Sequence, residues 1–379
     1  MTRMEKSVFR WRQALLPVIT IIVLVILKGL STPMYSTATG RFPAMMIEVM
    51  ASRTLLIFRA PAGYYEDLNR ASRPDWGRIG GAKYLPDAFR IRRFRPNLTT
   101  VADSPRIISP TNRFGYTGPD WQLIKPPGTR RIAVFGDSIT QGLGLSSDQT
   151  FVSLLASRLN ADRVPNQQHF EFLNFAVPAY QFPGIMDVAL QDAPQFQPDV
   201  YVLMLTELSV YRSWDNHLVY LTQTGVDPKY DFVRKIISES NARQTDDVTT
   251  LNAKFAPYRM SMIRQNILKM KDNAEQHHAQ FLVVLVPGVE DADISRQRFA
   301  GIPELLSSMN ITYIDLSDTF TGMLDRQSIR LSRVDTHPNP RGDEMIYEAL
   351  YSKLRANPEA WSKLVGPTVR NDAQIARRK

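Results

Sequence analysis

Short apolar runs alternate with segments of helical spacing beyond residue 130, and this alternation limits the fold more than any other feature. The run 199–205, DVYVLML, is typical of a parallel strand covered on both faces, because no polar side chain alternates with the apolar ones. The expected strands are 132–135, 170–177, 199–205, 281–286 and 311–316. The expected helices are 150–159, 185–190, 260–277 and 344–354. Strands that alternate with helices predict an α/β fold, in which right-handed crossovers place helices on both faces of a parallel sheet.

Residues 207–255 interrupt this alternation at the carboxyl end of the expected strand 199–205. They include Trp214, Asn216, His217 and several tyrosines. Ligands of open α/β sheets bind at the carboxyl ends of the strands, so an insertion here can form a cap over a substrate. A mobile surface loop is the equal alternative.

The first 31 residues predict a membrane helix. Four cations, at positions 3, 6, 10 and 12, precede the apolar run 14–27, ALLPVITIIVLVIL. The run has the length of a signal-peptide core, but Lys28 follows it directly and 11–30 is long enough to span a bilayer. We favour an uncleaved signal-anchor over a cleaved signal peptide. The positive-inside rule then predicts a single-pass protein of the inner (plasma) membrane, with its main domain facing the periplasm or outside.

The chain divides into four expected regions. They are the cytoplasmic N-terminus and anchor 1–31, a connecting region 32–111, a main domain 112–360 and a basic C-terminal tail 361–379. Residues 41–63 predict an amphipathic helix, which docks on the domain or lies on the membrane surface. Arginines at 90, 92, 93 and 95 form a basic cluster, which is a solvated strand face or a contact for acidic lipid or polymer.

Composition narrows the classes of partner. The chain has no cysteine, which excludes disulfides and thiolate metal sites. It has 46 Lys and Arg against 37 Asp and Glu, and the net charge of +9 favours contact with anionic lipid or acidic polymer. No recognition motif for nucleic acid is present, so we expect no nucleic-acid partner. We expect neither a metal ion nor an organic cofactor.

Ser138 directly follows the first expected strand, in the sequence Gly136-Asp137-Ser138. It is either a nucleophile presented at the end of that strand, or part of a polar cap that Asp137 and Ser138 form for the next helix. A serine nucleophile needs a base to remove its proton and an acid to orient that base.

His337 is the candidate base among the five histidines, because it alone has a neighbouring carboxylate and a restrained backbone. Pro338 disfavours the helical region for His337 and so keeps it extended. Side chains two apart in an extended chain point the same way, so Asp335 can hold the Nδ1–H of His337. The Nε2 atom of His337 is then free to face a serine.

Four sequence blocks occur in order across residues 112–350. They are GDSITQG at 136–142, NFAVPAY at 174–180, Pro198-Asp199 with the strand that follows, and DTHPN at 335–339. Upstream, NRFGYTGP at 112–119 is similar to the lead-in segment of exported members of one superfamily. In these blocks the chain resembles the SGNH hydrolase superfamily, also called GDSL esterases.

The resemblance implies a flavodoxin-like, three-layer α/β/α sandwich with a parallel sheet and a triad in which Ser138 attacks, His337 is the base and Asp335 orients it. It also implies an oxyanion site made by the Ser138 N–H, a glycine N–H of the second block and an asparagine of the third. Ala179 stands at the glycine position, and Leu208 stands where the asparagine is usual. The oxyanion or substrate-binding candidates are Ala179, Gly142, Ser209 and Asn216, with Thr206 as a further replacement for the asparagine.

An anchored, outward-facing member of this superfamily resembles proteins that add or remove O-acetyl groups on exopolysaccharides. The implied function is that of a serine esterase or acyl transferase acting on esters of envelope polysaccharide or lipid, and transfer implies a membrane acyl-donor protein as partner. Hydrolysis and transfer share an acyl-enzyme, so the sequence does not separate them. The alternative is a catalytically weak or inactive scaffold or binding protein of an envelope assembly. The missing asparagine favours this alternative, and the intact Ser138, Asp335 and His337 oppose it.

Overall fold

The computed structural model describes residues 84–99, 109–163, 168–212, 214–333 and 335–366. All of them belong to the unit formed by residues 70–379. The expected anchor 1–31, the expected amphipathic helix 41–63 and most of the expected C-terminal tail lie outside the described residues. Within the part of the chain that is described, no helix is both long enough and apolar enough to cross a bilayer.

Five parallel strands form the central sheet. They are β3 (Thr129–Phe135), β4 (His169–Asn174), β5 (Val200–Thr206), β6 (Gln280–Val286) and β7 (Tyr313–Asp315). Their order is β4-β3-β5-β6-β7, and every neighbouring pair is parallel. This is the flavodoxin-like order, in which the chain reverses direction across the sheet between β3 and β5. The carboxyl ends of β3 and β5 therefore mark the switch point at which such sheets bind ligands.

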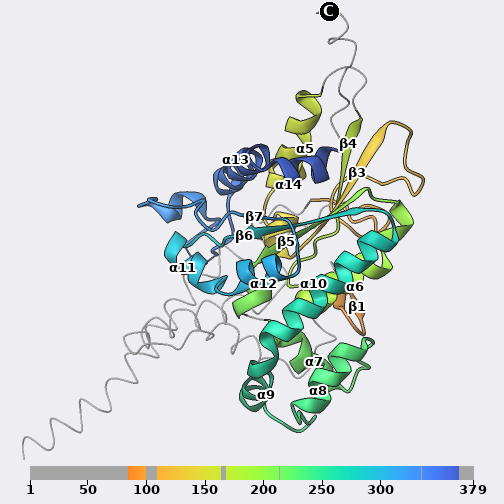
Figure 1. The fold of residues 1–379 in the computed structure, drawn as a ribbon, viewed down its shortest axis with the longest axis vertical. Coiled ribbons are helices and arrows are strands. Elements are labelled where there is room, and N and C mark those ends of the chain that lie inside the picture. The colour runs from red at the N-terminus through yellow and green to blue at the C-terminus, as the bar shows by residue number, and fades with distance from the viewer. Residues whose placement is uncertain (1–83, 100–108, 164–167, 213, 334, 367–379) are drawn as a thin grey trace, which may run out of the picture. The chain divides into compact units, whose positions relative to one another are not determined.

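Helices cover both faces of this sheet, because successive residues of the buried strands point to opposite sides (Figure 1). Val134 packs with α5 (Phe151–Ala161), α13 (Pro340–Ala356) and α14 (Pro358–Val365) on one face. Phe135 packs with α6 (Phe182–Gln191), α10 (Arg259–Gln276) and α12 (Ile302–Ser308) on the other. The predicted α/β fold, with a parallel sheet and helices on both faces, is confirmed.

Two expected strands are shorter than predicted. β4 ends at Asn174 rather than 177, because the Asn174 side chain accepts a hydrogen bond from the Ala176 N–H (3.1 Å) and turns the backbone. β7 pairs only over Tyr313–Asp315, although the expected strand was 311–316. The short helices α4 (Ser138–Gln141), α11 (Ala292–Arg298), α12 and α14 were not predicted.

The segment expected as an insertion, 207–255, is largely helical. A π-helical turn, Leu208–Arg212, leads to α7 (Asn216–Thr224), α8 (Asp231–Glu239) and α9 (Val248–Phe255). Leu218, Val233 and Phe255 are fully buried in a separate small core that these helices share. The helices are therefore held by their own apolar packing, beyond the carboxyl end of β5.

An antiparallel hairpin precedes the sheet, and it packs on the helical segment and on the main core. Its strands are β1 (Tyr84–Asp87) and β2 (Ile91–Phe94). Phe89 and Ile91 join the small core of α7–α9, whereas Phe94 joins the core under α6. The hairpin thus contacts both the small core of α7–α9 and the main core. The sequence had placed it in a connecting region outside the main domain.

Candidate active site

Ser138 lies at the first turn of α4, immediately beyond the carboxyl end of β3. Gly136 makes the turn possible, because a Cβ there would lie 2.1 Å from the Thr140 Oγ1. The Asp137 carboxylate caps α4 by accepting the Ile139 N–H (3.0 Å), and it also accepts the hydroxyl of Thr206. The cap interpretation of Asp137 is confirmed, and it leaves the Ser138 hydroxyl free for another partner.

His337 is that partner, although it is 199 residues distant in sequence. The Ser138 Oγ lies 2.7 Å from the His337 Nε2, and the Asp335 Oδ1 lies 2.6 Å from the His337 Nδ1. Since a carboxylate only accepts, Nδ1 carries the hydrogen and Nε2 is the acceptor for the serine proton. The structure therefore brings Ser138, His337 and Asp335 together in a nucleophile–base–acid arrangement.

The loop that carries His337 is fixed on two sides. Its base is closed by an antiparallel bridge between Arg330 and Pro338, and the Leu331 N–H donates to the His337 carbonyl (2.9 Å). The Leu331 side chain lies over Gly144, where a Cβ would be 2.6 Å from the Leu331 Cδ1. Because Gly144 follows α4, this contact joins the histidine loop to the serine turn.

Asp343 fixes the helix that follows this loop. Its carboxyl oxygen accepts the Phe151 N–H (2.9 Å), which ties the first turn of α13 to the start of α5. The side chain is buried without a cationic partner among the described residues, and this burial raises the pKa of Asp343 to about 8. Our sequence reasoning missed this residue, and its position shortly after His337, directly before the expected helix 344–354, was the available signal.

The second block approaches the same turn from β4. The Asn174 amide donates to the Thr140 carbonyl (2.9 Å), so the end of β4 is held against α4. Ala179 is exposed and has a φ of 63°, the left-handed region that glycine adopts most readily. Its N–H has no hydrogen-bond partner among the described residues. Alanine thus keeps the backbone conformation of the glycine that the resemblance implies at this position.

Two of the other oxyanion candidates, Gly142 and Thr206, have their donors committed to other hydrogen bonds. Gly142 terminates α4 and its N–H is bonded to the Ile139 carbonyl (3.2 Å), so its role is structural. The hydroxyl of Thr206 is committed to Asp137. Ser209 is buried in the π-helical turn, and its hydroxyl has no partner within the described residues. Asn216 begins α7 rather than ending β5.

Glu207 is a further residue of this edge that our sequence reasoning missed. Its buried carboxylate accepts the Ser295 hydroxyl (2.8 Å), the Gly288 N–H (3.1 Å) and the Arg298 guanidinium. These bonds connect the end of β5 to the loop after β6 and to α11. An acidic residue directly after an apolar strand was the signal that could have identified it.

The remaining histidines are poor candidates for the base. His217 is buried, and desolvation lowers its pKa to about 4, so it is neutral over the physiological range. His169, His277 and His278 are exposed. No cluster of three or more His, Asp or Glu side chains suited to a metal ion occurs among the residues that the structure describes.

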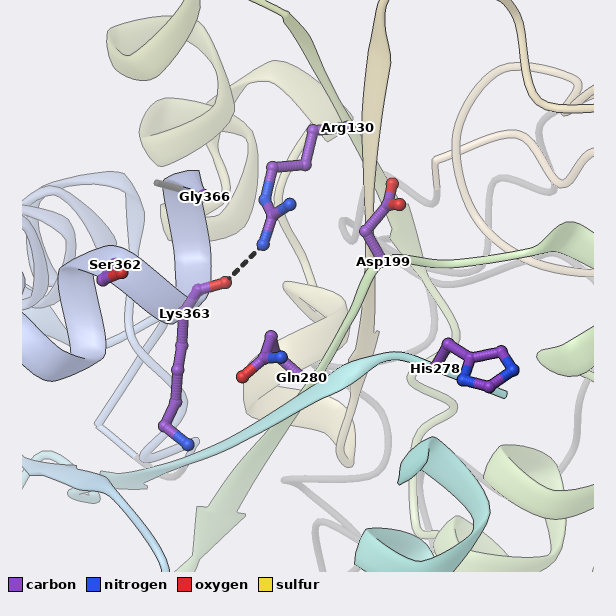
Figure 2. Close-up of a pocket in the computed structure, with 7 residues that line it drawn as sticks. All are labelled: Arg130, Asp199, His278, Gln280, Ser362, Lys363 and Gly366. Atoms are coloured by element: carbon purple, nitrogen blue, oxygen red, sulfur yellow. Dashed lines mark hydrogen bonds between the residues drawn. The ribbon is translucent and has the colours of Figure 1, made fainter. Parts of the chain in front are cut away.

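Figure 2 shows a cavity of about 260 Å³ near the amino ends of the strands, whereas Ser138 lies beyond their carboxyl ends. Arg130 near the start of β3, Asp199 before β5 and Gln280 at the start of β6 line it. The Arg130 guanidinium donates to the carbonyls of Lys363 and Leu364 (both 2.7 Å), so it anchors the end of α14. Figure 2 shows the bond to Lys363. This cavity is on the wrong edge of the sheet to serve Ser138.

Comparison with known proteins gives one family. The sequence model of the GDSL-like lipase/acylhydrolases matches residues 132–350. A search of curated proteins finds no match.

Three of the solved structures that match the chain are the following. An acetylxylan esterase from Geobacillus stearothermophilus is 12% identical with a TM-score of 0.39, covering 62% of this chain and 96% of its own. A psychrotrophic esterase from Pseudoalteromonas sp. is 14% identical with a TM-score of 0.36, covering 60% and 97%. A lipase/acylhydrolase from Enterococcus faecalis is 13% identical with a TM-score of 0.37, covering 60% and 96%.

Proposed function

Because the chain belongs to the GDSL-like lipase/acylhydrolase family, we propose that it cleaves or transfers acyl esters with Ser138 as the nucleophile. The observation that supports this most strongly is the unbroken chain of short contacts from Ser138 through His337 to Asp335. Three residues from opposite ends of the domain meet at the switch point of the sheet.

The proposed reaction has two stages. As the Ser138 Oγ attacks the ester carbonyl carbon, its proton passes to the His337 Nε2, and Asp335 stabilises the imidazolium through Nδ1–H. His337 then gives this proton to the departing alcohol, and the acyl group remains on Ser138. Water or an acceptor hydroxyl next attacks the acyl carbon while His337 takes its proton, which releases the acid or the new ester. Hydrolysis and transfer therefore differ only in the acceptor.

Two backbone N–H groups can stabilise the negative charge that develops on the carbonyl oxygen of the ester. The Ser138 N–H belongs to the first turn of α4, where helices leave N–H groups without intrahelical partners. The Ala179 N–H is free among the described residues. We assign these two donors to the oxyanion, with the loss of either expected to cost about 10²–10³ in rate.

The proposed substrates are acyl esters of envelope polysaccharide or lipid, reached by an anchored domain that faces outward. The apolar run 14–27 behind four cations supports this location. For transfer, a membrane acyl-donor protein is the proposed partner. A reporter enzyme fused after residue 60 should be active only outside the cytoplasm, and activity inside would overturn the orientation.

An inactive scaffold is the second candidate, and Leu208 is the observation that favours it. Leucine donates no hydrogen bond where the superfamily has an asparagine, and Thr206 is already bonded to Asp137. Such a protein would keep the site geometry without turnover.

Hydrolysis of p-nitrophenyl acetate separates the two candidates. The full-length protein should release p-nitrophenol faster than its Ser138→Ala variant, by about 10³-fold or more, because the nucleophile is removed. His278→Ala is the matched control, since this histidine is exposed at the other edge of the sheet. Equal rates for the wild type and Ser138→Ala would leave the scaffold as the function.

A further inference from the structure

A second cavity, of about 290 Å³, lies beside the second-block loop. Val177 and Tyr180 of that loop line it, on either side of Ala179 in sequence. Arg90 and Arg93 of the hairpin line another part, together with Lys229, which precedes α8. Its volume is at the small end of the range for ligand pockets, which is about 300–1,000 Å³. The cavity is thus suited to a small ligand, and it adjoins a loop of the proposed active site.

Two carboxylates that line this cavity, those of Asp187 and Asp192, are already neutralised by cations. Arg90 pairs with Asp187 (2.5 Å) and binds both carboxylate oxygens of Asp192 (2.7 and 2.8 Å). Asp187 also accepts bonds from Lys229 and from the Tyr230 hydroxyl (2.5 Å). The Tyr116 hydroxyl donates to Asp192. These carboxylates therefore have little capacity left for a ligand.

The third acid, Asp87, is occupied in part by its own turn. One of its oxygens accepts the N–H groups of Phe89 (3.0 Å) and Arg90 (2.7 Å). The hydroxyl of Tyr180 is likewise used, since it donates to the Arg92 carbonyl (2.7 Å). Few of the carboxylate oxygens and hydroxyl groups that line the cavity therefore remain free to bind a ligand.

The unused groups are mainly cationic donors. The Arg93 guanidinium is exposed, and it makes no hydrogen bond or ion pair with any residue that the structure describes. The Lys229 ammonium, whose side chain is 40% exposed, bonds one carboxylate oxygen of Asp187 and has further N–H groups to offer. A ligand that complements this wall carries a carboxylate or a similar anion.

We propose that this cavity, between the hairpin and the second-block loop, binds a carboxylate-bearing sugar, with Arg93 and Lys229 as the groups that recognise the acid. The inference deepens the proposed function, on which it rests for its link to ester chemistry, by naming acidic glycan as the substrate class. The glycan would then run past Ala179, so that a neighbouring acylated sugar can reach Ser138.

The surroundings favour a sugar over a lipid surface. Large exposed apolar side chains of the described residues are Leu123, Ile124, Tyr211, Ile294 and Leu324, and none of them lines this cavity. Membrane-surface sites combine cations with apolar side chains that insert between lipids. A concave polar pocket with no exposed apolar rim instead fits a hydrated ligand.

Calorimetric binding tests the proposal. The protein is full-length Ser138→Ala, so that turnover does not consume the ligand, and the probes are tetramers of galacturonate, glucuronate and mannuronate. At least one should bind, and its methyl ester, which has the same sugar without the charge, should bind about tenfold more weakly or worse. Arg93→Gln should weaken binding of the acid by about tenfold, because it removes the free guanidinium. Arg95→Gln is the matched control, since Arg95 is an equally exposed arginine just beyond the same strand that does not line the cavity.

Several outcomes of these measurements would overturn the proposal. It fails if no acidic tetramer binds at about 10 mM, if acid and ester bind alike, or if Arg93→Gln and Arg95→Gln weaken binding equally. Binding of glycerol 3-phosphate in place of every sugar would assign the cavity to a lipid headgroup. Failure of the subsite is distinguishable from failure of the proposed function, because serine-dependent hydrolysis without sugar binding removes only the subsite. Sugar binding without hydrolysis removes only the esterase.

Discussion

At the scale of single residues, Asp335 accepts two hydrogen bonds from His337, one from the ring and one from the backbone. Its Oδ1 lies 2.6 Å from Nδ1 and also accepts the His337 N–H at 3.1 Å. One carboxylate oxygen therefore sets both the position of the loop and the tautomer of the ring. This double contact follows from the two-residue spacing, which places the carboxylate beside its own histidine.

Replacing Asp335 by Asn should abolish most activity. Unlike a carboxylate, an amide can donate a hydrogen bond to Nδ1 as well as accept one from it, so it does not keep the hydrogen on Nδ1. The ring then no longer presents a basic Nε2 to Ser138, and kcat/KM should fall by about 10³–10⁴. Thermal unfolding of Asp335→Asn should change little by comparison. Asp231→Asn, at an exposed ion pair, is the control and should keep full activity. A loss of less than about tenfold in Asp335→Asn would contradict the role given to this carboxylate.

Asp343 should make stability depend on pH. Its pKa in the folded protein, about 8, is above the ordinary value of 3.8, so the folded state binds this proton more tightly than the unfolded state between these pH values. Its contribution to stability is therefore complete below about pH 4 and is lost as pH rises towards 8, by at most about 1.4 kcal/mol per pH unit.

Urea unfolding at pH 5, 6, 7 and 8 measures this slope. Asp343→Asn keeps an oxygen acceptor for the Phe151 N–H but cannot ionise, so its free energy of unfolding should fall less steeply with pH than that of the wild type. Parallel slopes for the two proteins would show that Asp343 titrates normally.

The elements differ in how far the sequence could predict them. β5 and β6 could be found because each is a continuous apolar run, but the order β4-β3-β5-β6-β7 could not, since it depends on tertiary packing. The bond between Asp137 and Thr206 at the switch point could not be predicted for the same reason, because it requires β3 and β5 to be neighbours. Asp335 and His337 could be predicted because Pro338 and their spacing act locally.

Replacing Gly144 should disturb the loop that carries His337, because Gly144 packs against Leu331 of that loop. Gly144→Ala places a methyl group 2.6 Å from the Leu331 Cδ1 and forces alanine to a φ of 86°. Leu331 must move, and it is bonded to the His337 carbonyl, so we expect kcat/KM to fall about tenfold or more.

Gly128→Ala is the matched control. Its φ is 71°, but nothing lies within 4 Å of the added Cβ, so it carries only the backbone strain of about 1–2 kcal/mol. Adding Leu331→Ala to Gly144→Ala should recover part of the activity. Equal losses of activity in Gly144→Ala and Gly128→Ala would show that the contact does not position His337.

On the scale of the whole molecule, Arg90 joins the hairpin to the main core. Its guanidinium is largely buried and bonds Asp187 within α6 and Asp192 at the end of that helix. Arg90→Ala leaves both carboxylates without their main cation and should lower the free energy of unfolding by about 3 kcal/mol. Arg234→Ala, which breaks only exposed contacts (ion pairs with Asp227 and Asp231 and a hydrogen bond to the Lys229 carbonyl), should cost about 1 kcal/mol or less in the same urea titration. Similar losses in both variants would mean that the hairpin is not held by this network.

The nucleophile is the central claim, and covalent labelling of the full-length protein tests it most directly. A fluorophosphonate reacts with a serine that an adjacent base activates, and mass spectrometry of the digested protein locates the adduct. The adduct should lie on Ser138, and His337→Ala should prevent it because the Oγ then loses its base. An unlabelled Ser138, or labelling that is unchanged in His337→Ala, would contradict the assignment.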